Sequence, residues 1–529
     1  MLKIIGLGIL LFILHGCAQI NPLTGGEKDT FAPKFVLEKT FPQPGQLNYT
    51  GKTIHLHFDE FVVLKNQTTA ITITPQPPTT PLISSKNKKV IIQFNEDLEE
   101  NTTYSIGFNG AIADYNEGND SIFQYVFSTG SYIDSCSFIG SIKDGFTNLP
   151  QKSVLIGLYR QNLTEDFDSI PIKNKPTYIG QSDLNGNFKL QYIKAGIYTA
   201  FAFEDLDRNL LYNPKVESIA FLSKKEINLM DAVSDTVLFK LFKPTSKDTL
   251  IDSYELNYPG RLKIIFNATP KNLKVHTQQL LVQENTGSKD SVVYWMTEKY
   301  KNNDPIIIQF NNQTDTIQPI MKNLPKKVAP LTIENNLKNG KLLPKDTLTL
   351  SFSEPIGKFD ESGIRLFDKD SSALTYTVQK IDARQFQFLF DKEKAHYLTL
   401  DSAATKSILS SSTNDKTSIN LVFHSLKYLG NLKLTLKTDS LINGVLQIYT
   451  KAEKIIFEAS YSDTLQQYNL TELEPGEYYL RFINDIDTNK RFTPGDFHEN
   501  RQPETVYYHT SPVKVRSNWD FELTWSINL

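Results

Sequence analysis

Cysteine is nearly absent from this sequence, and methionine, tryptophan and histidine are also scarce. Its 529 residues include two cysteines, four methionines, three tryptophans and eight histidines. Cys17 and Cys136 allow at most one disulfide, so the fold must be stabilised by hydrophobic cores and not by a covalent framework. Cys136 has no CxxC partner and no neighbouring histidine, which favours a packed or spare thiol over a reactive one.

Excess charge and catalytic motifs are missing as well. The formal net charge is −3, which gives neither the basic footprint of a nucleic-acid-binding protein nor a polybasic membrane patch. The sequence contains no GxSxG, no HExxH, no glycine-rich phosphate loop and no Cys/His arrangement. We therefore expect no nucleic-acid partner, no required cofactor and no enzymatic activity.

One short apolar run stands at the start of the chain. Lys3 is followed by apolar residues 4–14, and polar residues return from Gln19 onward. A membrane-spanning helix needs about 20 apolar residues, so this run is too short to span a bilayer. A charged start followed by a short apolar core is typical of a cleaved signal peptide, which we place at residues 1–16.

The residues after the apolar run resemble the bacterial lipobox. They read Leu14-His15-Gly16-Cys17, although His15 departs from the small or aliphatic residue usual at that place. The resemblance implies that Cys17 becomes the mature N-terminus and carries acyl chains such as palmitate, so that no second cysteine would be available to form a disulfide with Cys136. Two or more acyl chains give stable membrane anchoring. The alternative is a cysteine that falls there by chance.

Ala18, directly after the cysteine, favours the outer membrane, because an aspartate at that place is associated with retention in the inner membrane. An early acidic cluster, associated with export to the cell surface, is missing. Periplasmic and surface exposure therefore both stay open. Residues 18–33 are polar and rich in Gly, Pro and Thr, which suits a flexible tether.

Short strand-like segments dominate the rest of the chain. They are rich in β-branched and aromatic residues, often alternate at a period of two, and are separated by clusters of turn-forming residues. Clear examples are residues 54–58, 90–94, 262–266, 306–310, 347–352 and 386–390. No long amphipathic helix stands out. The pattern predicts an all-β fold made of β-sandwiches in series.

An internal duplication supports this serial arrangement. Residues 193–214 match residues 473–494 without a gap, with Gly196 opposite Gly476 at an offset of 280 (476 − 196). A weaker match pairs residues 57–62 with 351–356 at an offset of 294 (351 − 57). A unit of two domains is therefore predicted to occur twice.

The first domain resembles the bacterial Ig-like module of the S-layer-protein type. The resemblance lies in Phe41-Pro42-Gln43-Pro44-Gly45, a strand ending in Asp59-Glu60, the Tyr104 strand, the turn 113–119 and the closing Tyr125–Gly130 stretch. The smaller domains resemble transthyretin-like or carboxypeptidase-regulatory modules through Gly196-Ile197-Tyr198 and Gly476-Glu477-Tyr478. The whole chain is similar to the Ig-like-domain lipoproteins common in Bacteroidota, a resemblance that implies fold and location but no catalytic activity.

These observations divide the chain into seven predicted segments. They are a signal peptide (1–16), a lipidated tether (17–31), an Ig-like domain (32–130), a transthyretin-like β-sandwich (135–242), a β domain (243–327), a second Ig-like domain (328–426) and a second transthyretin-like β-sandwich (427–529).

The duplicated segment carries an Asp-x-Asp-x-Asn motif in each copy. Its residues are candidate calcium ligands, because alternate residues of a tight loop can direct hard oxygens at one point. The candidates are Asp205, Asp207 and Asn209 in the first copy, and Asp485, Asp487, Asn489 and Asp496 in the second. The glycine of an EF-hand loop is replaced by Leu210 and Lys490, so these are not EF-hands. The alternative is a turn in which Asp and Asn bind their own backbone and no metal is needed.

Two weaker candidates come from histidine and aromatic residues. His55 and His57 project from one face of a strand, but no third ligand is evident, and an exposed strand face explains the pair equally well. Trp295 and Tyr507-Tyr508 could form a binding platform if they lie on loops, or they could fill sandwich cores.

Together these features predict an outer-membrane-anchored lipoprotein that acts as a non-catalytic β scaffold or binding protein of the cell envelope. Its expected partners are the membrane, other envelope proteins or glycans. The alternative is a carbohydrate- or peptide-binding accessory of an uptake complex.

Overall fold

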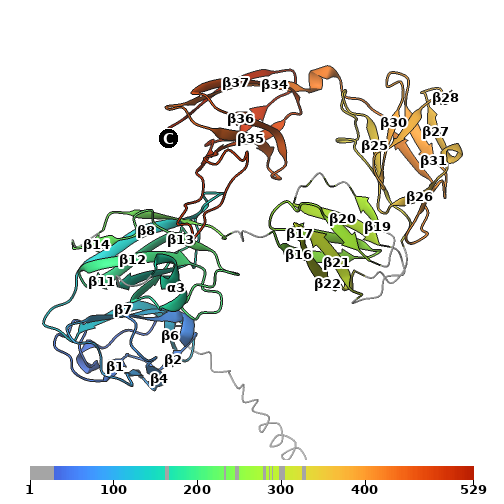
Figure 1. Cartoon of the computed structure of the whole chain (residues 1–529). Coiled ribbons are helices and arrows are strands. Elements are labelled where there is room, and N and C mark those ends of the chain that lie inside the picture. The colour runs from blue at the N-terminus through green and yellow to red at the C-terminus, as the bar shows by residue number, and fades with distance from the viewer. Residues whose placement is uncertain are drawn as a thin grey trace, which may run out of the picture. The chain divides into compact units, whose positions relative to one another are not determined.

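The structure is a computed structural model and confirms the all-β prediction (Figure 1). It describes residues 29–528 except 161–165, 231–233, 245–248, 278–280, 285, 287, 289, 297–303 and 324–328. The signal peptide, Cys17 and Ala18 therefore lie outside the described residues. In the described part of the chain, no helix is long and apolar enough to cross a membrane.

The chain divides into two compact units, residues 1–242 and 243–529, which are described separately. Each of the five predicted β ranges contains a hydrophobic core cluster, and two of these ranges lie in the first unit and three in the second. We refer to these ranges as regions 1 to 5. Their boundaries stay a prediction.

Region 1 is a two-sheet sandwich, with sheets β1-β5-β4 and β2-β6-β3 and with β7 paired to β6. Alternation along the strand explains its core, since Ile54 and Leu56 of β1 are buried while His55 and His57 lie on the other face. Its elements are η1 (Leu37–Lys39), β1 (Thr53–His57), β2 (Val62–Leu64), α2 (Gln67–Ala70), β3 (Ile71–Thr74), β4 (Leu82–Lys86), β5 (Lys89–Gln93), β6 (Thr103–Asp114) and β7 (Asp120–Ser128).

The predicted turn between the last two strands of region 1 is confirmed. Asp114 ends β6, and its carboxylate accepts hydrogen bonds from the backbone N–H groups of Glu117, Gly118 and Asn119 at 2.5–3.0 Å. These bonds lower the pKa of Asp114 although burial acts to raise it.

Region 2 packs the sheet β10-β9-β12-β13, with β14 paired to β12, against the sheet β11-β8-β15. Its last strand runs parallel to its first, with Val237 opposite Gly140. Cys136 is buried in its core, as expected for a packed thiol. Its elements are β8 (Cys136–Asp144), β9 (Leu155–Arg160), η2 (Phe167–Ser169), α3 (Ile170–Lys173), β10 (Tyr178–Gln181), β11 (Asn187–Ile193), β12 (Gly196–Phe203), β13 (Ile219–Phe221), β14 (Ile227–Leu229) and β15 (Val237–Leu241).

Region 3 begins the second unit, with sheets β19-β20-β17-β16-β23 and β18-β21-β22. Its core gathers alternate residues of β17 and β21, among them Leu262, Ile264, Ile306 and Ile308. Its strands are β16 (Ile251–Asn257), β17 (Arg261–Phe266), β18 (Lys274–His276), β19 (Leu281–Glu284), β20 (Ser291–Met296), β21 (Ile306–Phe310), β22 (Gln313–Ile317) and β23 (Met321–Lys322).

Region 4 repeats the strand pairing of region 1. The long strand β6 of region 1 corresponds to two shorter strands of region 4, β31 and β32. With that difference, the pairs β1–β5, β5–β4, β2–β6, β3–β6 and β6–β7 correspond in order to β25–β30, β30–β29, β26–β32, β27–β31 and β31–β33. Its elements are β24 (Ile333–Asn335), β25 (Leu348–Phe352), β26 (Ile356–Phe359), η3 (Glu361–Gly363), β27 (Ile364–Phe367), β28 (Ala373–Leu374), β29 (Thr377–Lys380), β30 (Gln385–Leu389), β31 (Tyr397–Leu400), β32 (Thr405–Ser407) and β33 (Thr417–Asn420).

Region 5 repeats the topology of region 2 strand for strand, with sheets β36-β35-β38-β39, where β40 pairs with β38, and β37-β34-β41. Its last strand again runs parallel to its first, from Asn431 opposite Asp520 to Thr438 opposite Ile527. Its elements are η4 (Leu426–Tyr428), β34 (Gly430–Thr438), β35 (Gly444–Thr450), β36 (Ile455–Tyr461), β37 (Leu465–Leu473), β38 (Gly476–Asn484), β39 (Val506–Tyr508), β40 (Val513–Val515) and β41 (Asp520–Ile527).

Candidate functional site

The first acidic loop lies between β12 and β13 of region 2. Asp205, Asp207 and Glu217 each place a carboxylate oxygen within 4.8 Å of the others. Asp207 is exposed, whereas Glu217 is only 1% exposed. The two aspartates were predicted from the motif, and the structure brings them together with a glutamate from the far end of the loop.

The second acidic loop lies at the equivalent place in region 5, between β38 and β39. Here the group is formed by Asp485, Asp487 and Glu504, again within 4.8 Å. Asp485 and Glu504 are 4% and 3% exposed. The group of carboxylates therefore occurs twice with the same composition.

Backbone N–H groups donate hydrogen bonds to these carboxylates in the same pattern in both copies. Asp205 accepts from Asn209 and Leu210 at 3.0 and 3.2 Å, as Asp485 does from Asn489 and Lys490 at 3.0 and 2.9 Å. The side-chain amide of Asn209 donates to Asp207 and its oxygen accepts from the backbone of Leu211, and Asn489 does the same with Asp487 and Arg491. These bonds are those of a self-capped turn.

The buried glutamate of each loop closes it from the other side. Glu217 accepts from the backbone N–H groups of Leu206 and Asn213, both at 2.8 Å. Glu504 accepts from those of Ile486 and Thr493 at 2.7 and 2.8 Å. Each glutamate thus ties the start of its loop to the middle.

Asp496, the fourth candidate in the second loop, does not belong to the carboxylate group. Its side chain accepts from the backbone N–H of Glu499 at 3.0 Å, and its backbone pairs with Arg501. Glu504 stands 19 residues after Asp485, whereas Glu217 stands 12 residues after Asp205, so the second loop is longer. Asp496 was a candidate because it is the twelfth residue counted from Asp485, where an EF-hand loop carries its last ligand, and this count missed Glu504.

Burial and like charge shift the pKa values of these groups. Burial raises the pKa of Glu217 and of Glu504, and the neighbouring aspartates raise both further. Burial also raises the pKa of Asp205. In the second loop, hydrogen bonds from Thr493 and Asn489 outweigh the effect of burial and lower the pKa of Asp487.

The loops have the donor chemistry for calcium and the geometry of a turn. Three carboxylates within reach of one point are hard oxygen ligands, and each oxygen has a second lone pair beyond its backbone bond. Leu210 and Lys490 both adopt a left-handed backbone, with φ of 64°, at the place where an EF-hand carries glycine. The turn is thus held by its own hydrogen bonds, and calcium stays the alternative that binding experiments have to test.

The weaker candidates, the histidine pair and the aromatic residues, have different outcomes in the structure. His55 and His57 share the outer face of β1, as predicted, and burial and then Lys89 lower the pKa of both. Trp295 is 2% exposed and lies on β20, so the alternative of a packed aromatic is confirmed for this residue and the alternative of an exposed loop platform is wrong. Tyr507 and Tyr508 lie half-buried on β39.

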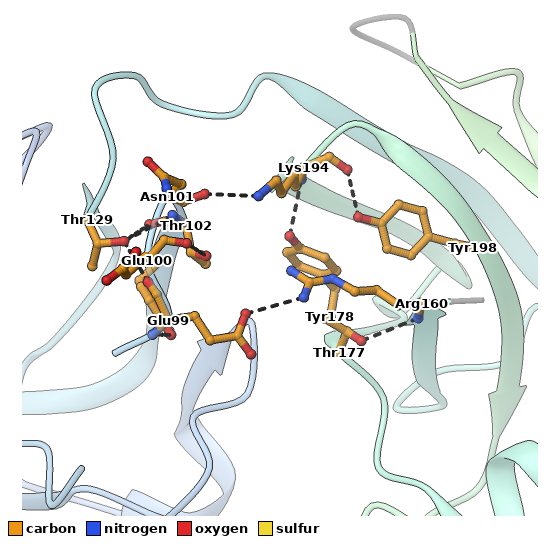
Figure 2. Close-up of polar contacts among 11 residues, drawn as sticks. Glu99, Glu100, Asn101, Thr102, Thr129, Arg160, Thr177, Tyr178, Lys194 and Tyr198 are labelled. Atoms are coloured by element: carbon orange, nitrogen blue, oxygen red, sulfur yellow. Dashed lines mark hydrogen bonds and ion pairs between the residues drawn. The ribbon is translucent and has the colours of Figure 1, made fainter. Parts of the chain in front are cut away.

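The junction between regions 1 and 2 is formed by polar contacts (Figure 2). The Glu99 carboxylate accepts from Arg160 at 3.3 Å, and the Asn101 carbonyl accepts from Lys194 Nζ at 3.1 Å. The Thr177 carbonyl also accepts from the backbone N–H of Gln76 at 2.9 Å.

Two tyrosines fix the region 2 side of this junction. The Tyr178 hydroxyl accepts from the backbone N–H of Lys194 at 3.1 Å, and the Tyr198 hydroxyl donates to the Lys194 carbonyl at 2.7 Å (Figure 2). Burial raises the pKa of both hydroxyls above the ordinary tyrosine value, so both keep their protons into alkaline solution. They hold the backbone of the residue whose side chain reaches region 1.

The junction between regions 3 and 4 centres on Glu284. Its carboxylate accepts from Arg384 of region 4 at 2.8 Å, and from Arg261 and the Trp295 indole of region 3 at 3.4 and 2.8 Å. Burial acts to raise the Glu284 pKa, but the Arg384 charge and the other two donors outweigh it and lower the pKa. Leu409 of region 4 packs against Trp295 in the same contact.

Comparison with known proteins identifies one part of the chain. The model of the bacterial Ig-like domain matches residues 29–129, which confirms the resemblance stated for the first domain. A comparison with curated protein sequences finds no match. The Bacteroidota and transthyretin-like resemblances stay predictions.

Several solved structures are similar to the chain at low scores. The Bacillus anthracis TIE protein is 9% identical with a TM-score of 0.15, over 95% of this chain and 76% of that one. The major pilin subunit BcpA of Bacillus cereus is 10% identical with a TM-score of 0.14, over 74% and 99%. The RrgB pilus protein from Streptococcus pneumoniae is 10% identical with a TM-score of 0.19, over 72% and 94%. Such scores carry no argument about function.

Proposed function

We propose that this chain is a non-catalytic scaffold of the bacterial cell envelope, which presents serial β-sandwiches from a lipid anchor on Cys17 at the outer membrane. The junctions between neighbouring regions carry the proposal. Glu284 and Arg384 place opposite, largely buried charges on the two sides of one junction, and the backbone hydrogen bond from Gln76 to Thr177 joins the two sides of the other. Contacts used in this way set the spacing of consecutive regions, which is the task of a scaffold.

The test combines activity and location. The purified chain is assayed against glycoside, ester and peptide substrates, and we expect no turnover. Turnover abolished by a single substitution such as Asp207→Asn would contradict the proposal. Protease shaving and crosslinking on intact cells, followed by membrane fractionation, report whether the chain faces the periplasm or the exterior. Recovery in the cytoplasmic fraction would also contradict it.

A second candidate function is glycan or peptide binding within an uptake complex. The observation that favours it is an aromatic group on one face of the sheet β36-β35-β38-β39. Tyr479 is half-buried and stacks at 5.8 Å between ring centroids on Tyr449, which is 6% exposed and lies under Arg481 at 4.6 Å, so Tyr479 is the ring that a ligand could reach. Rings and guanidinium groups of this kind are common in sugar- and peptide-binding surfaces.

This second function is tested on a glycan array. Binding by the full chain that is lost on Tyr479→Ala, but kept on the control Tyr132→Ala, would support it. Tyr132 is a suitable control because it is 55% exposed and lies outside region 5. Equal binding by both variants would remove this candidate.

A further inference from the structure

One end of region 4 is an established contact surface. This end carries Arg384, which precedes β30, and Leu409, which follows β32. Leu409 packs with Val293 and Trp295 of region 3, and the Arg384 guanidinium lies 5.4 Å from the Trp295 ring centroid. Because Arg384 also binds Glu284, this end of the sandwich docks on an aromatic ring beside a carboxylate.

Backbone hydrogen bonds identify the equivalent end of region 1. Lys88 takes the place of Arg384, since their carbonyls accept from the backbone N–H groups of Phe58 and Phe352, both at 2.9 Å. The carbonyls of Phe61 and Pro355 likewise accept from the backbone N–H groups of Tyr115 and Ile408, both at 3.0 Å. Lys88 thus matches the contact residue Arg384, and Phe61 and Tyr115 match Pro355 and Ile408, of which Ile408 directly precedes the contact residue Leu409. We call Phe61, Lys88 and Tyr115 the Phe61 surface.

The Phe61 surface is exposed and aromatic. Phe61 is 54% exposed and Tyr115 is 70% exposed. Large aromatic side chains at high exposure are characteristic of protein-binding surfaces, where they supply most of the binding energy. In region 4 the matching end carries Pro355 and Ile408, next to the buried Leu409.

The side chains of Lys88 and Arg384 are both positioned by a hydrogen bond to a backbone carbonyl. Its ammonium lies 5.7 Å from the Phe61 ring centroid and donates to the Asp59 carbonyl at 2.6 Å. Arg384 likewise donates to a carbonyl at the end of the equivalent strand, that of Phe352, at 2.7 Å. An ammonium has three donors, so Lys88 can bind a carboxylate of a partner while keeping its bond to Asp59.

We propose that the Phe61 surface docks a β domain of a partner protein that presents a carboxylate beside an aromatic ring, as Glu284 and Trp295 do for region 4. The proposal rests on the scaffold function, because it names the kind of partner that the scaffold holds. Asp59 and Glu60 at the same end would meet many like charges on an anionic lipid surface, whereas a single partner carboxylate can pair directly with the Lys88 ammonium. A protein partner is therefore the better match.

The test is site-specific photo-crosslinking of the full chain in its own cells. Benzoylphenylalanine replaces Tyr115, and the crosslinked product is identified by mass spectrometry. We expect one protein product, with the crosslink in a β domain near an acidic and an aromatic residue. Lys88→Glu should reduce its yield about fivefold or more, and reversal of the partner's acidic residue to lysine should restore it.

Lys52→Glu is the matched control. Lys52 precedes β1 and so lies at the opposite end of that strand from Phe58, and its exposed pair with Asp97 contributes little to stability. We expect the control to keep the full crosslink yield. A thermal melt of each variant checks that the fold is intact.

Every other result overturns the proposal. These results are a crosslink only to lipid, a crosslink only to residues 17–28 of the same chain, no crosslink, or a protein crosslink that Lys88→Glu leaves unchanged or that charge reversal does not restore. None of them bears on the scaffold function itself, which is tested by turnover and cell fractionation.

Discussion

Each acidic loop closes on one buried glutamate that accepts two backbone hydrogen bonds. Glu504→Gln keeps the size of the side chain but replaces one accepting oxygen with a donor. The N–H of Ile486 or of Thr493 then loses its acceptor, and we expect a loss of about 1–3 kcal/mol in the free energy of unfolding. Urea unfolding measures this loss.

Asp496→Asn provides the control for that substitution. Asp496 accepts one backbone hydrogen bond, from Glu499, and the oxygen of an asparagine can accept it equally well. We expect a change of less than about 0.5 kcal/mol, as for substitutions away from buried networks. Equal losses in both variants would contradict the role assigned to Glu504.

Glu217 predicts a pH dependence whose sign follows from its raised pKa. Because the folded state binds this proton at higher pH than the unfolded state, the contribution of Glu217 is most favourable at or below its ordinary pKa of 4.5 and declines as pH rises above that value. Glu217→Gln removes this contribution. We therefore expect the parent's advantage over the variant to be largest near pH 4.5 and to shrink toward pH 7 in urea unfolding. An advantage that grew with pH would contradict the assignment.

At the scale of elements, the acidic loops have enough internal hydrogen bonds to hold their shape. Asp205 and Asp485 each accept two backbone N–H groups. We therefore expect the melting temperature of the purified chain to be the same in EDTA and in millimolar calcium. A rise in calcium, reversed by EDTA and lost in Asp207→Asn with Asp487→Asn, would instead establish a metal site.

The junction of regions 3 and 4 depends on a charge that is largely removed from water. Arg384→Ala would leave the Glu284 carboxylate, 10% exposed, with fewer donors. We expect a loss of about 1.5–3 kcal/mol, the range for hydrogen bonds to charged groups, measured by urea unfolding of the full chain.

Arg365→Ala is the matched control for the junction. Arg365 pairs with Asp401 in the same region, but the two side chains are 53% and 41% exposed. Exposed pairs contribute about 0–1 kcal/mol, so this variant should be nearly as stable as the parent. An equal loss in both variants would show that Arg384 has no special place at the junction.

Strands were predictable from sequence, whereas contacts between strands far apart were not. Alternation identified 54–58, 90–94 and 386–390, which lie at β1, β5 and β30 within one residue at each end. For Trp295 the sequence left both an exposed platform and a packed ring open, because local sequence does not show that Glu284 and Leu409 contact it. The contact of Glu284 with Arg384 joins residues 100 positions apart, which no local pattern encodes.

At the scale of the whole molecule, location depends on Cys17. We expect Cys17→Ser to abolish labelling by radioactive palmitate and to shift the chain from the membrane to the soluble fraction or to an unprocessed precursor. Serine cannot form the thioether on which the acyl anchor depends. Cys136→Ser is the control and should keep the label, because Cys136 is buried in region 2. Labelling that follows Cys136 would contradict the predicted anchor.

The internal duplication made the repeated features of the fold predictable from the sequence, but not the contacts between regions. The offset of 280 places Asp485 opposite Asp205, and regions 2 and 5 share their strand order. The copies nevertheless differ where they meet their neighbours. In region 2, Arg160 lies opposite Tyr198 on the neighbouring strand and reaches region 1. In region 5, the equivalent position opposite Tyr478 is occupied by Thr450. Contacts of this kind vary with the neighbour, so a repeat found in the sequence does not reveal them.

The parallel pairing of first and last strands in regions 2 and 5 has a mechanical consequence. Because β8 and β15, like β34 and β41, run in the same direction, the chain enters each region at one end of the pair and leaves at the other. Tension between entry and exit therefore slides the two strands along each other and loads all their hydrogen bonds at once. A region connected in this way resists pulling far better than one whose hydrogen bonds open one after another.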